Sequence, residues 1–171
     1  KTLHPRNPAA ILPRGDLPEH LEALQSAGME PIALVVVNLS PFEQTAARPD
    51  CTFEAAVENI DIGGPSLIRA ASKNHDSVAV LTDPDQYQNF LAEFRETGGA
   101  SLDTRKRLAR EAFALTGAYD RAIAAYLEKQ EKADEAPVGA LPPTLDLHFP
   151  LKQTLRYGEN PHQQAGLYVD P

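Results

Sequence analysis

One segment, ENIDIGGPSLIRAASKNH (58–75), gathers several groups that could bind a ligand and transfer protons. Pro65 suits the first turn of a helix, where free backbone N–H groups favour an anion. Arg69 and Lys73 lie four residues apart on that expected helix and so share a face. Asp61 could lie near Lys73, which would place a hydrogen-bond acceptor and a proton-transfer group around one ligand. The pattern alone is more typical of a capped surface helix with an Asp61–Lys73 ion pair, because most charged helix residues are solvated.

Two other stretches are dense in reactive groups. Residues 156–162 (RYGENPH) offer a planar cation suited to phosphate, an aromatic hydroxyl and a titratable imidazole. The same residues also fit an irregular polar loop. The opening KTLHP combines a lysine, a hydroxyl and an imidazole, although a chain end is usually frayed. The sequence contains no GxGxxG, Walker, GxSxG or HExxH motif.

The segments around these groups alternate between expected strands and helices. Residues 32–39 (IALVVVNL) and 77–82 (SVAVLT) are continuous apolar runs, typical of strands buried on both faces of a parallel sheet. Expected helices begin after Thr52, at about Ser66 and after Asp83; the second runs to Asn74 and the third ends at Gly98. This order predicts an α/β fold in which helices flank a parallel sheet.

The regions on either side of this alternation carry weaker patterns. Three prolines within residues 1–15 predict an extended or looped start, because each removes a backbone donor. Asp16 and Glu19 resemble a capping box for a helix that ends at Gly28. Residues 102–132 have the apolar spacing of one long amphipathic helix, or of two joined at Gly117. A linker is expected over 136–144 (APVGALPPT) and a short strand over 145–151.

Composition excludes several classes of protein. Acidic residues outnumber basic ones by 24 to 16, and no dense block of Lys or Arg could follow a nucleic-acid backbone. The longest apolar run, residues 32–37, is too short to span a bilayer. A single cysteine, Cys51, excludes a disulfide framework, and no metal-ligand spacing is present. We therefore expect a cytoplasmic protein without nucleic-acid, membrane or metal partners. The missing initiator Met and the abrupt end predict a segment of something larger.

Three motifs in order resemble the bifunctional purine-biosynthesis family that combines phosphoribosylaminoimidazolecarboxamide (AICAR) formyltransferase with inosine monophosphate (IMP) cyclohydrolase. They are KTLHP at 1–5, VVVNLSPFEQT through NIDIGGPSLIRAASKNH at 35–75, and LRYGENPHQ at 155–163. The resemblance implies a homodimeric enzyme that moves a formyl group from 10-formyltetrahydrofolate to AICAR and then cyclises formyl-AICAR to IMP. It also implies a domain organisation: a methylglyoxal-synthase-like α/β cyclohydrolase domain over 1–135 that lacks its first part, a linker over 136–144, and the start of the formyltransferase domain over 145–171.

The resemblance further implies roles for individual residues. Lys73 would be the proton donor and acceptor of ring closure. The implied substrate-binding residues are Lys1, Thr2, Val37, Asn38, Asp61, Ile62, Arg156 and Tyr157. His162 and Ser40 are further candidates for these sites, and no metal ligand is implied.

Two departures from the family pattern favour alternative functions. The family usually reads NLYPF where this chain has Ser40, whose short side chain would reach the same atom only through a water. It also usually has Val-His-Gly-Gly where this chain has Asn-Pro-Ala-Ala at 7–10. Losing a hydrogen-bond donor of this kind typically costs about 2 to 4 kcal/mol of transition-state stabilisation. A catalytically degenerate nucleotide-binding or dimer-scaffolding remnant, or a protein with only the transferase activity, therefore stays open.

Overall fold

The structure is a computed structural model that describes residues 3–132, 147, 149–156 and 162–169. It divides into two compact units, Lys1–Ala133 and Asp134–Pro171, and each is described by itself. Lys1, Thr2, Tyr157 and the expected linker over 136–144 lie outside the described residues.

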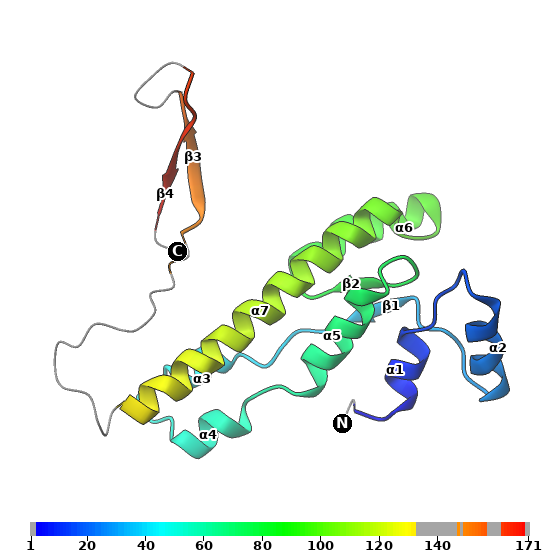
Figure 1. The fold of residues 1–171 in the computed structure, drawn as a ribbon, viewed down its shortest axis with the longest axis horizontal. Coiled ribbons are helices and arrows are strands. Elements are labelled where there is room, and N and C mark those ends of the chain that lie inside the picture. Colours follow the sequence, from blue (N-terminus) through cyan, green and yellow to red (C-terminus); the bar gives the residue numbers. More distant parts are fainter. Residues whose placement is uncertain (1–2, 133–146, 148, 157–161, 170–171) are drawn as a thin grey trace. The chain divides into compact units, whose positions relative to one another are not determined.

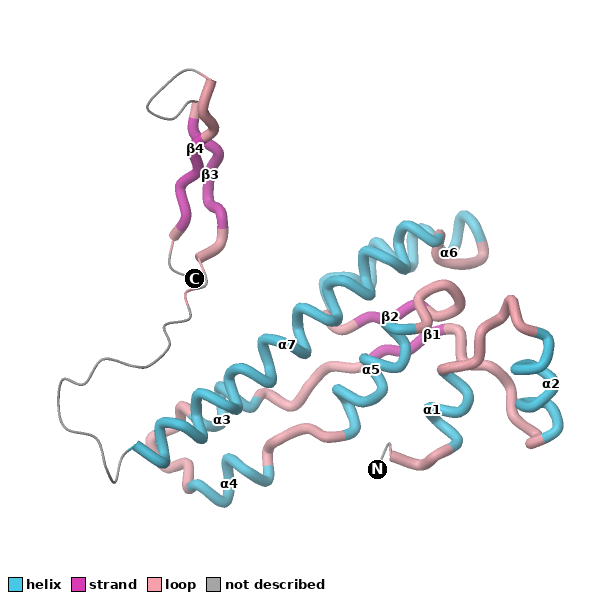
Figure 2. Tube along the Cα trace, in the orientation of Figure 1, coloured by secondary structure: helices cyan, strands magenta, loops and turns pink. Residues whose placement is uncertain are grey.

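The N-terminal unit is built on a small parallel sheet of two strands, β1 (Leu34–Val36) and β2 (Ala79–Leu81) (Figures 1 and 2). The expected α/β fold with a parallel sheet is confirmed, although both strands are shorter than predicted. All of β2 is buried, as predicted. In β1, however, Leu34 and Val36 are 41% and 48% exposed. The prediction of a strand covered on both faces is therefore wrong for β1, because alternate residues point to opposite faces and only the Val35 face is packed.

Two helices provide most of the packing against this sheet. Helix α5 (Gly63–Lys73) contacts both strands, and α7 (Leu102–Lys132) contacts β2 and lies along α5 (Figure 1). Their inward-facing residues join the strands in one apolar core, together with α1 and α6. Its members are Ile11, Val35, Ile68, Ala71, Val78, Ala79, Val80, Leu81, Phe90, Leu108 and Ala112. Helix α7 continues for 31 residues through Gly117, so the alternative of two joined helices is wrong.

The start of the chain differs from its prediction. Residues 6–11 form α1 (Arg6–Ile11), although Pro8 lies within it. Pro8 is tolerated because it occupies the first turn, where backbone N–H groups have no partner inside the helix. Helix α2 (Pro18–Ser26) has no side-chain cap; Asp16 instead accepts a hydrogen bond from Arg14 Nε at 3.0 Å, so the predicted capping box is wrong. The predicted stop at Gly28 is confirmed by its left-handed φ of 61°.

Shorter elements connect these main pieces. They are α3 (Phe42–Ala46), α4 (Phe53–Glu58), the 3₁₀ helix η1 (Pro84–Gln86) and α6 (Tyr87–Thr97). Thr52 caps α4 by accepting a hydrogen bond from Ala55 N–H, as predicted. Asp83 caps η1, and α6 ends at Gly98 in the left-handed conformation, which confirms both of those predictions. Helix α5 begins at Gly63, three residues earlier than expected.

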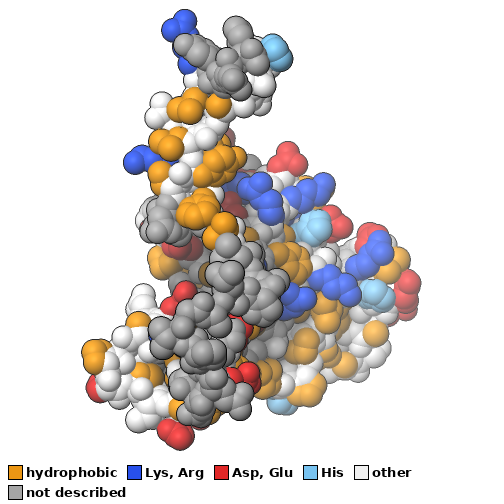
Figure 3. Space-filling model, turned by 60° about the vertical axis from the view of Figure 1, so that its left-hand side comes forward, with side chains coloured by type: hydrophobic (Ala, Val, Ile, Leu, Met, Phe, Trp, Pro, Cys, Tyr) orange, Lys and Arg blue, Asp and Glu red, His pale blue; other side chains and the backbone are white. Residues whose placement is uncertain are grey.

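The described part of the C-terminal unit is an antiparallel hairpin of β3 (Leu151–Leu155) and β4 (Ala165–Tyr168). The predicted strand over 145–151 is wrong in its position, because β3 begins only at Leu151 and the described residues before it are not in a strand. All five residues of β3 are exposed, and hydrophobic side chains of the hairpin reach the surface (Figure 3). An isolated two-stranded hairpin is marginally stable in water.

Candidate functional site

The connection between α4 and α5 is held by the carboxylate of Asp61. Its Oδ2 accepts a hydrogen bond from Ser40 N–H at 3.2 Å, and its Oδ1 accepts one from Gly64 N–H at 2.8 Å. One carboxylate thereby ties the loop after β1 to the first turn of α5. We refer to residues 59–64 as the Asp61 turn.

This arrangement requires a glycine at position 64. A Cβ at position 64 would lie 2.7 Å from Asp61 Oδ2 and 2.8 Å from Leu39 Cδ2. Glycine is the residue that permits so close an approach of backbone to neighbouring groups. In the described structure, the group that approaches Gly64 is the chain's own carboxylate.

Tyr119 of α7 supports the same turn from the opposite side. Its hydroxyl accepts a hydrogen bond from Asp61 N–H at 2.9 Å and lies 3.5 Å from the Asn59 carbonyl oxygen. Its ring packs edge-on against Phe42 and is 9% exposed. Burial raises the pKa of Tyr119, so its hydroxyl stays protonated at neutral pH. The sequence predicts only the apolar spacing of the long helix that carries Tyr119, because no local signal reveals a partner 58 residues away.

A cavity of about 390 Å³ lies beside this turn, next to the carboxyl ends of β1 and β2. Its lining includes Asn38, Ser40, Thr82, Asp83 and Tyr119. Ligands of open parallel α/β sheets bind in crevices outside the carboxyl ends of the strands. We call this space the carboxyl-edge cavity.

Most of the predicted residues near β1 gather around this cavity. Asn38 Oδ1 accepts a hydrogen bond from Tyr87 O–H at 3.1 Å, a contact that the sequence did not indicate. Val37 N–H donates to Leu81 O and so serves the sheet. Ile62 is 61% exposed, and its carbonyl accepts a hydrogen bond from Ser66 Oγ. The structure therefore brings Asn38 and Ser40 together with the Asp61 turn.

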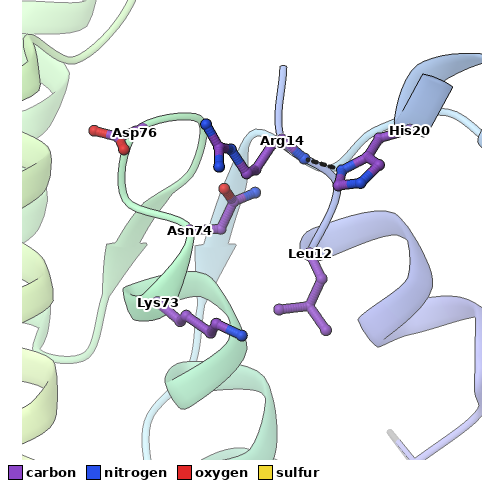
Figure 4. Close-up of a pocket in the computed structure, with 6 residues that line it drawn as sticks. All are labelled: Leu12, Arg14, His20, Lys73, Asn74 and Asp76. Atoms are coloured by element: carbon purple, nitrogen blue, oxygen red, sulfur yellow. Dashed lines mark hydrogen bonds between the residues drawn. The ribbon is translucent and has the colours of Figure 1, made fainter. Parts of the chain in front are cut away.

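Lys73 lies elsewhere, beside a second cavity of about 430 Å³ at the other end of α5 (Figure 4). We call this space the Lys73 cavity; its lining comprises Leu12, Arg14, His20, Lys73, Asn74 and Asp76. The residue after Lys73 is anchored firmly, since Asn74 Nδ2 donates to Ile11 O and to Pro13 O, both at 2.8 Å. These two bonds join the end of α5 to the connection between α1 and α2.

Asp61 and Lys73 are not brought together. Asp61 precedes α5 and Lys73 is its last residue, so the helix separates them by about 15 Å along its axis. The alternative Asp61–Lys73 ion pair is not among the ion pairs of the described residues. Arg69 and Lys73 both lie in α5, four residues apart as predicted, and the Arg69 guanidinium lies 5.6 Å from the centre of the Phe113 ring.

Two predicted residues of the C-terminal unit, Arg156 and His162, lie at one end of the hairpin. Arg156 directly follows β3, and His162 precedes β4 by three positions, next to the pairing of Leu155 with Ala165. Both side chains are exposed. Arg156 is thus available for a planar, bidentate contact with an anion.

The part of the chain that the structure describes contains neither a candidate metal site nor a candidate membrane span. No group of three or more His, Cys, Asp or Glu residues is arranged to hold a metal ion there. None of the described helices is both long and apolar enough to cross a membrane.

A family model and the sequences of individual relatives match this chain to the same group of proteins. The model of a family described as AICARFT/IMPCHase bienzyme matches residues 71–171. The bifunctional purine biosynthesis protein PurH of Thermosynechococcus vestitus is 53% identical over 169 residues, which cover 99% of this chain and 32% of that protein. PurH of Synechococcus sp. WH7803 is 51% identical over 175 residues, covering 100% of this chain and 33% of that protein. The chain therefore spans about a third of the length of these curated relatives.

A solved structure is similar as well. The crystal structure of ForH matches with a TM-score of 0.62 and 34% sequence identity. The match covers 74% of this chain and 66% of that one.

Proposed function

Because this chain belongs to the AICARFT/IMPCHase bienzyme family, we propose that it is a segment of an enzyme that catalyses the last two steps to IMP. The observation that carries the proposal is the family match over residues 71–171, which runs from α5 through α7 and across the hairpin. We propose a partial cyclohydrolase domain over 1–135 with a methylglyoxal-synthase-like fold, a linker over 136–144, and the start of the formyltransferase domain over 145–171.

The two reactions make different demands on the protein. In the first, the amine of AICAR takes a formyl group from 10-formyltetrahydrofolate. In the second, the carboxamide nitrogen of formyl-AICAR attacks the formyl carbon. The carboxamide nitrogen and the formylated amine nitrogen each lose one proton, and the formyl oxygen leaves as water. Ring closure therefore needs a proton acceptor at a weak nucleophile and a proton donor at the departing oxygen.

The carboxyl-edge cavity suits the nucleotide of the second reaction. Asn38 and Ser40 line it with neutral hydrogen-bonding groups, and the adjacent Asp61 turn exposes Ile62. Lys1 and Thr2 would complete this pocket. Asp61 would contribute by placing the backbone of the turn, since both of its oxygens already accept bonds from the chain's own amides.

Lys73 is the residue that we propose for proton transfer. Its ammonium group lies beside the Lys73 cavity and carries no hydrogen bond or ion pair with any described residue. Because α5 separates it from the Asp61 turn, a substrate held at that turn would have to extend along the helix to meet the lysine. For the transferase reaction, Arg156 and Tyr157 would contact AICAR, with His162 as a further candidate. We also propose that the enzyme acts as a homodimer.

The test of this function is cyclisation of formyl-AICAR by the full-length protein that contains this chain, measured as formation of IMP. We expect Lys73→Ala to lower the rate at least about a hundredfold, the usual contribution of a positioned proton-transfer group. Lys129→Ala, at an exposed lysine near the end of α7, is the matched control and should leave the rate unchanged. Equal activity of Lys73→Ala and the unaltered protein would remove Lys73 from the mechanism.

Ser40 provides the test of the degenerate alternative. At 53% identity to a PurH protein, the sequence does not favour a catalytically inactive remnant. If the unaltered full-length protein formed no IMP and Ser40→Tyr restored the reaction, a decayed cyclohydrolase would be the better description.

A further inference from the structure

One arginine of α7 holds the chain that follows Lys73. Arg105 lies near the start of α7, and its Nε donates a hydrogen bond to the His75 carbonyl oxygen at 2.8 Å. Its Nη2 donates to the Asp76 carbonyl oxygen at 2.9 Å, and its Nη1 donates to the Ala100 carbonyl oxygen. A guanidinium offers such donors in a rigid planar fork. None of the ion pairs among the described residues includes Arg105, so its guanidinium serves the backbone.

The connection that accepts two of these bonds, residues 74–78 between α5 and β2, is also held from its other side. Asn74 Nδ2 donates to two carbonyl oxygens at and just beyond the end of α1, and Ser77 Oγ accepts a hydrogen bond from Gly15 N–H at 3.2 Å. Figure 4 shows Asn74 in this connection, directly after Lys73 at the end of α5. The connection is therefore tied to the N-terminal helices on one side and to α7 on the other.

Lys73 depends on this backbone for its position. Its ammonium carries no hydrogen bond or ion pair with any described residue, so no side-chain contact fixes the end of the lysine. A lysine ammonium is a point charge on a flexible four-carbon stem. A reacting group displaced by about 1 Å can lose about a hundredfold in rate. The bonds from Arg105 also hold the backbone of Asp76, the acidic residue in the described lining of the Lys73 cavity.

We propose that Arg105 is a positioning residue for ring closure: by holding the carbonyl groups of His75 and Asp76, it keeps Lys73 at the place from which it transfers protons. This inference rests on the proposed function, in which Lys73 is the proton-transfer residue. It extends the working residues to α7, which supplies none of the described lining of the Lys73 cavity. The sequence did not indicate this role, because Arg105 lies 30 residues after His75.

The experiment measures cyclisation of formyl-AICAR by the full-length protein that contains this chain, with Arg105→Lys as the main variant. A lysine keeps the charge but presents a single nitrogen, which cannot replace the guanidinium fork at three carbonyl groups. We expect kcat to fall about tenfold with KM unchanged, less than the hundredfold limit because Asn74 still anchors the connection. Arg107→Lys is the matched control; Arg107 pairs with Glu111 on the same helix, so kcat should stay unchanged.

A second measurement separates positioning from a general effect on the fold. The same substitution is made in the Lys73→Ala protein, where an arginine that acts through the lysine has nothing left to position. Arg105→Lys should then lower the rate by less than about twofold, although it lowers kcat about tenfold when Lys73 is present. Arg105→Gln, which keeps one NH₂ group, should show the same dependence on Lys73.

Rates are divided by the folded fraction from circular dichroism, so that a loss of stability is not counted as a loss of positioning. Equal losses with and without Lys73 would overturn the inference, because Arg105 would then act on the whole fold. An unchanged kcat for Arg105→Lys beside a slow Lys73→Ala protein would overturn it and leave the proposed function in place. If Lys73→Ala itself cyclised at the unaltered rate, the proposed role of Lys73 and its positioning by Arg105 would both fall.

Discussion

The two ends of α5 carry residues from one sequence motif but use them in different ways. At the N-terminal end, both oxygens of Asp61 accept hydrogen bonds from backbone amides, and Tyr119 accepts one from Asp61 N–H. At the C-terminal end, the Lys73 ammonium and the Asn74 oxygen have no partner among the described residues. Residues of a single motif therefore divide between groups that are paired within the chain and groups that line a cavity.

This difference predicts where substitutions reduce stability and where they reduce binding. Groups at the Asp61 end are already paired within the chain, so their removal should lower the free energy of unfolding. Lys73 makes no described contact of that kind, so its removal should mainly change ligand binding and turnover. Stability measurements on variants at the Asp61 end of α5 test whether this difference between the two ends is real.

Gly64→Ala should have the largest effect. The added Cβ would lie within 2.8 Å of both Asp61 Oδ2 and Leu39 Cδ2, so either the Asp61 carboxylate or the loop after β1 must move. We expect a loss of about 3 kcal/mol in the free energy of unfolding, typical of overpacking a buried site. Urea unfolding followed by circular dichroism would measure it.

The control for that substitution is Gly99→Ala, because a Cβ there meets no atom within 4 Å. It should change stability by less than about 0.5 kcal/mol. Equal stability of the Gly64 and Gly99 variants would show that the Asp61 turn accommodates a side chain, and the close approach would then not explain the glycine.

Asp61→Asn should have the next largest effect. An asparagine of the same shape has one oxygen, so its NH₂ group would face one of the two backbone donors, Ser40 N–H or Gly64 N–H. We expect a loss of about 2 kcal/mol, the usual value for a hydrogen bond to a charged group. The exposed Asp50 provides the control substitution Asp50→Asn, which should leave the urea midpoint unchanged. An unchanged midpoint for Asp61→Asn would leave Asp61 free to serve the ligand directly.

Features that depend on neighbouring residues could be predicted from the sequence. Thr52 was predicted as a helix cap, and Gly28 and Gly98 as helix ends, because each acts through its own backbone or a bond three residues away. The order of strands and helices was predicted for the same reason, since apolar spacing is a local property.

Features that depend on distant partners could not be predicted. Asp16 looked like a helix cap, but Arg14 competes for its carboxylate and forms a bidentate pair. The position of Tyr119 against Asp61 joins residues 58 apart, and no spacing rule connects them. The separation of Asp61 from Lys73 follows only once α5 is seen to begin at Gly63, which places the whole helix between them.

Tyr119→Phe should have a smaller effect than either change to the turn. The substitution keeps the ring against Phe42 but leaves Asp61 N–H without its acceptor. We expect a loss of about 1 kcal/mol. Tyr87→Phe removes a hydroxyl whose bond to Asn38 lies at an exposed position, so it should cost less and serves as the matched comparison. A larger loss for Tyr87→Phe would contradict the assignment of Tyr119 as the support of the turn.

The smallest expected effect is a dependence of stability on alkaline pH. Burial raises the pKa of Tyr119 in the folded chain above the value of about 10 that it has when unfolded. Its contribution to stability is therefore fully present below about pH 10 and is lost as the pH rises through the folded value. The stability advantage of the unaltered chain over Tyr119→Phe should shrink over that range in urea titrations. Phe94→Leu, which changes no titrating group, should keep a constant difference from the unaltered chain. A constant difference for Tyr119→Phe as well would mean that the hydroxyl is not shielded from water, and that the Asp61 end is more open than its hydrogen bonds indicate.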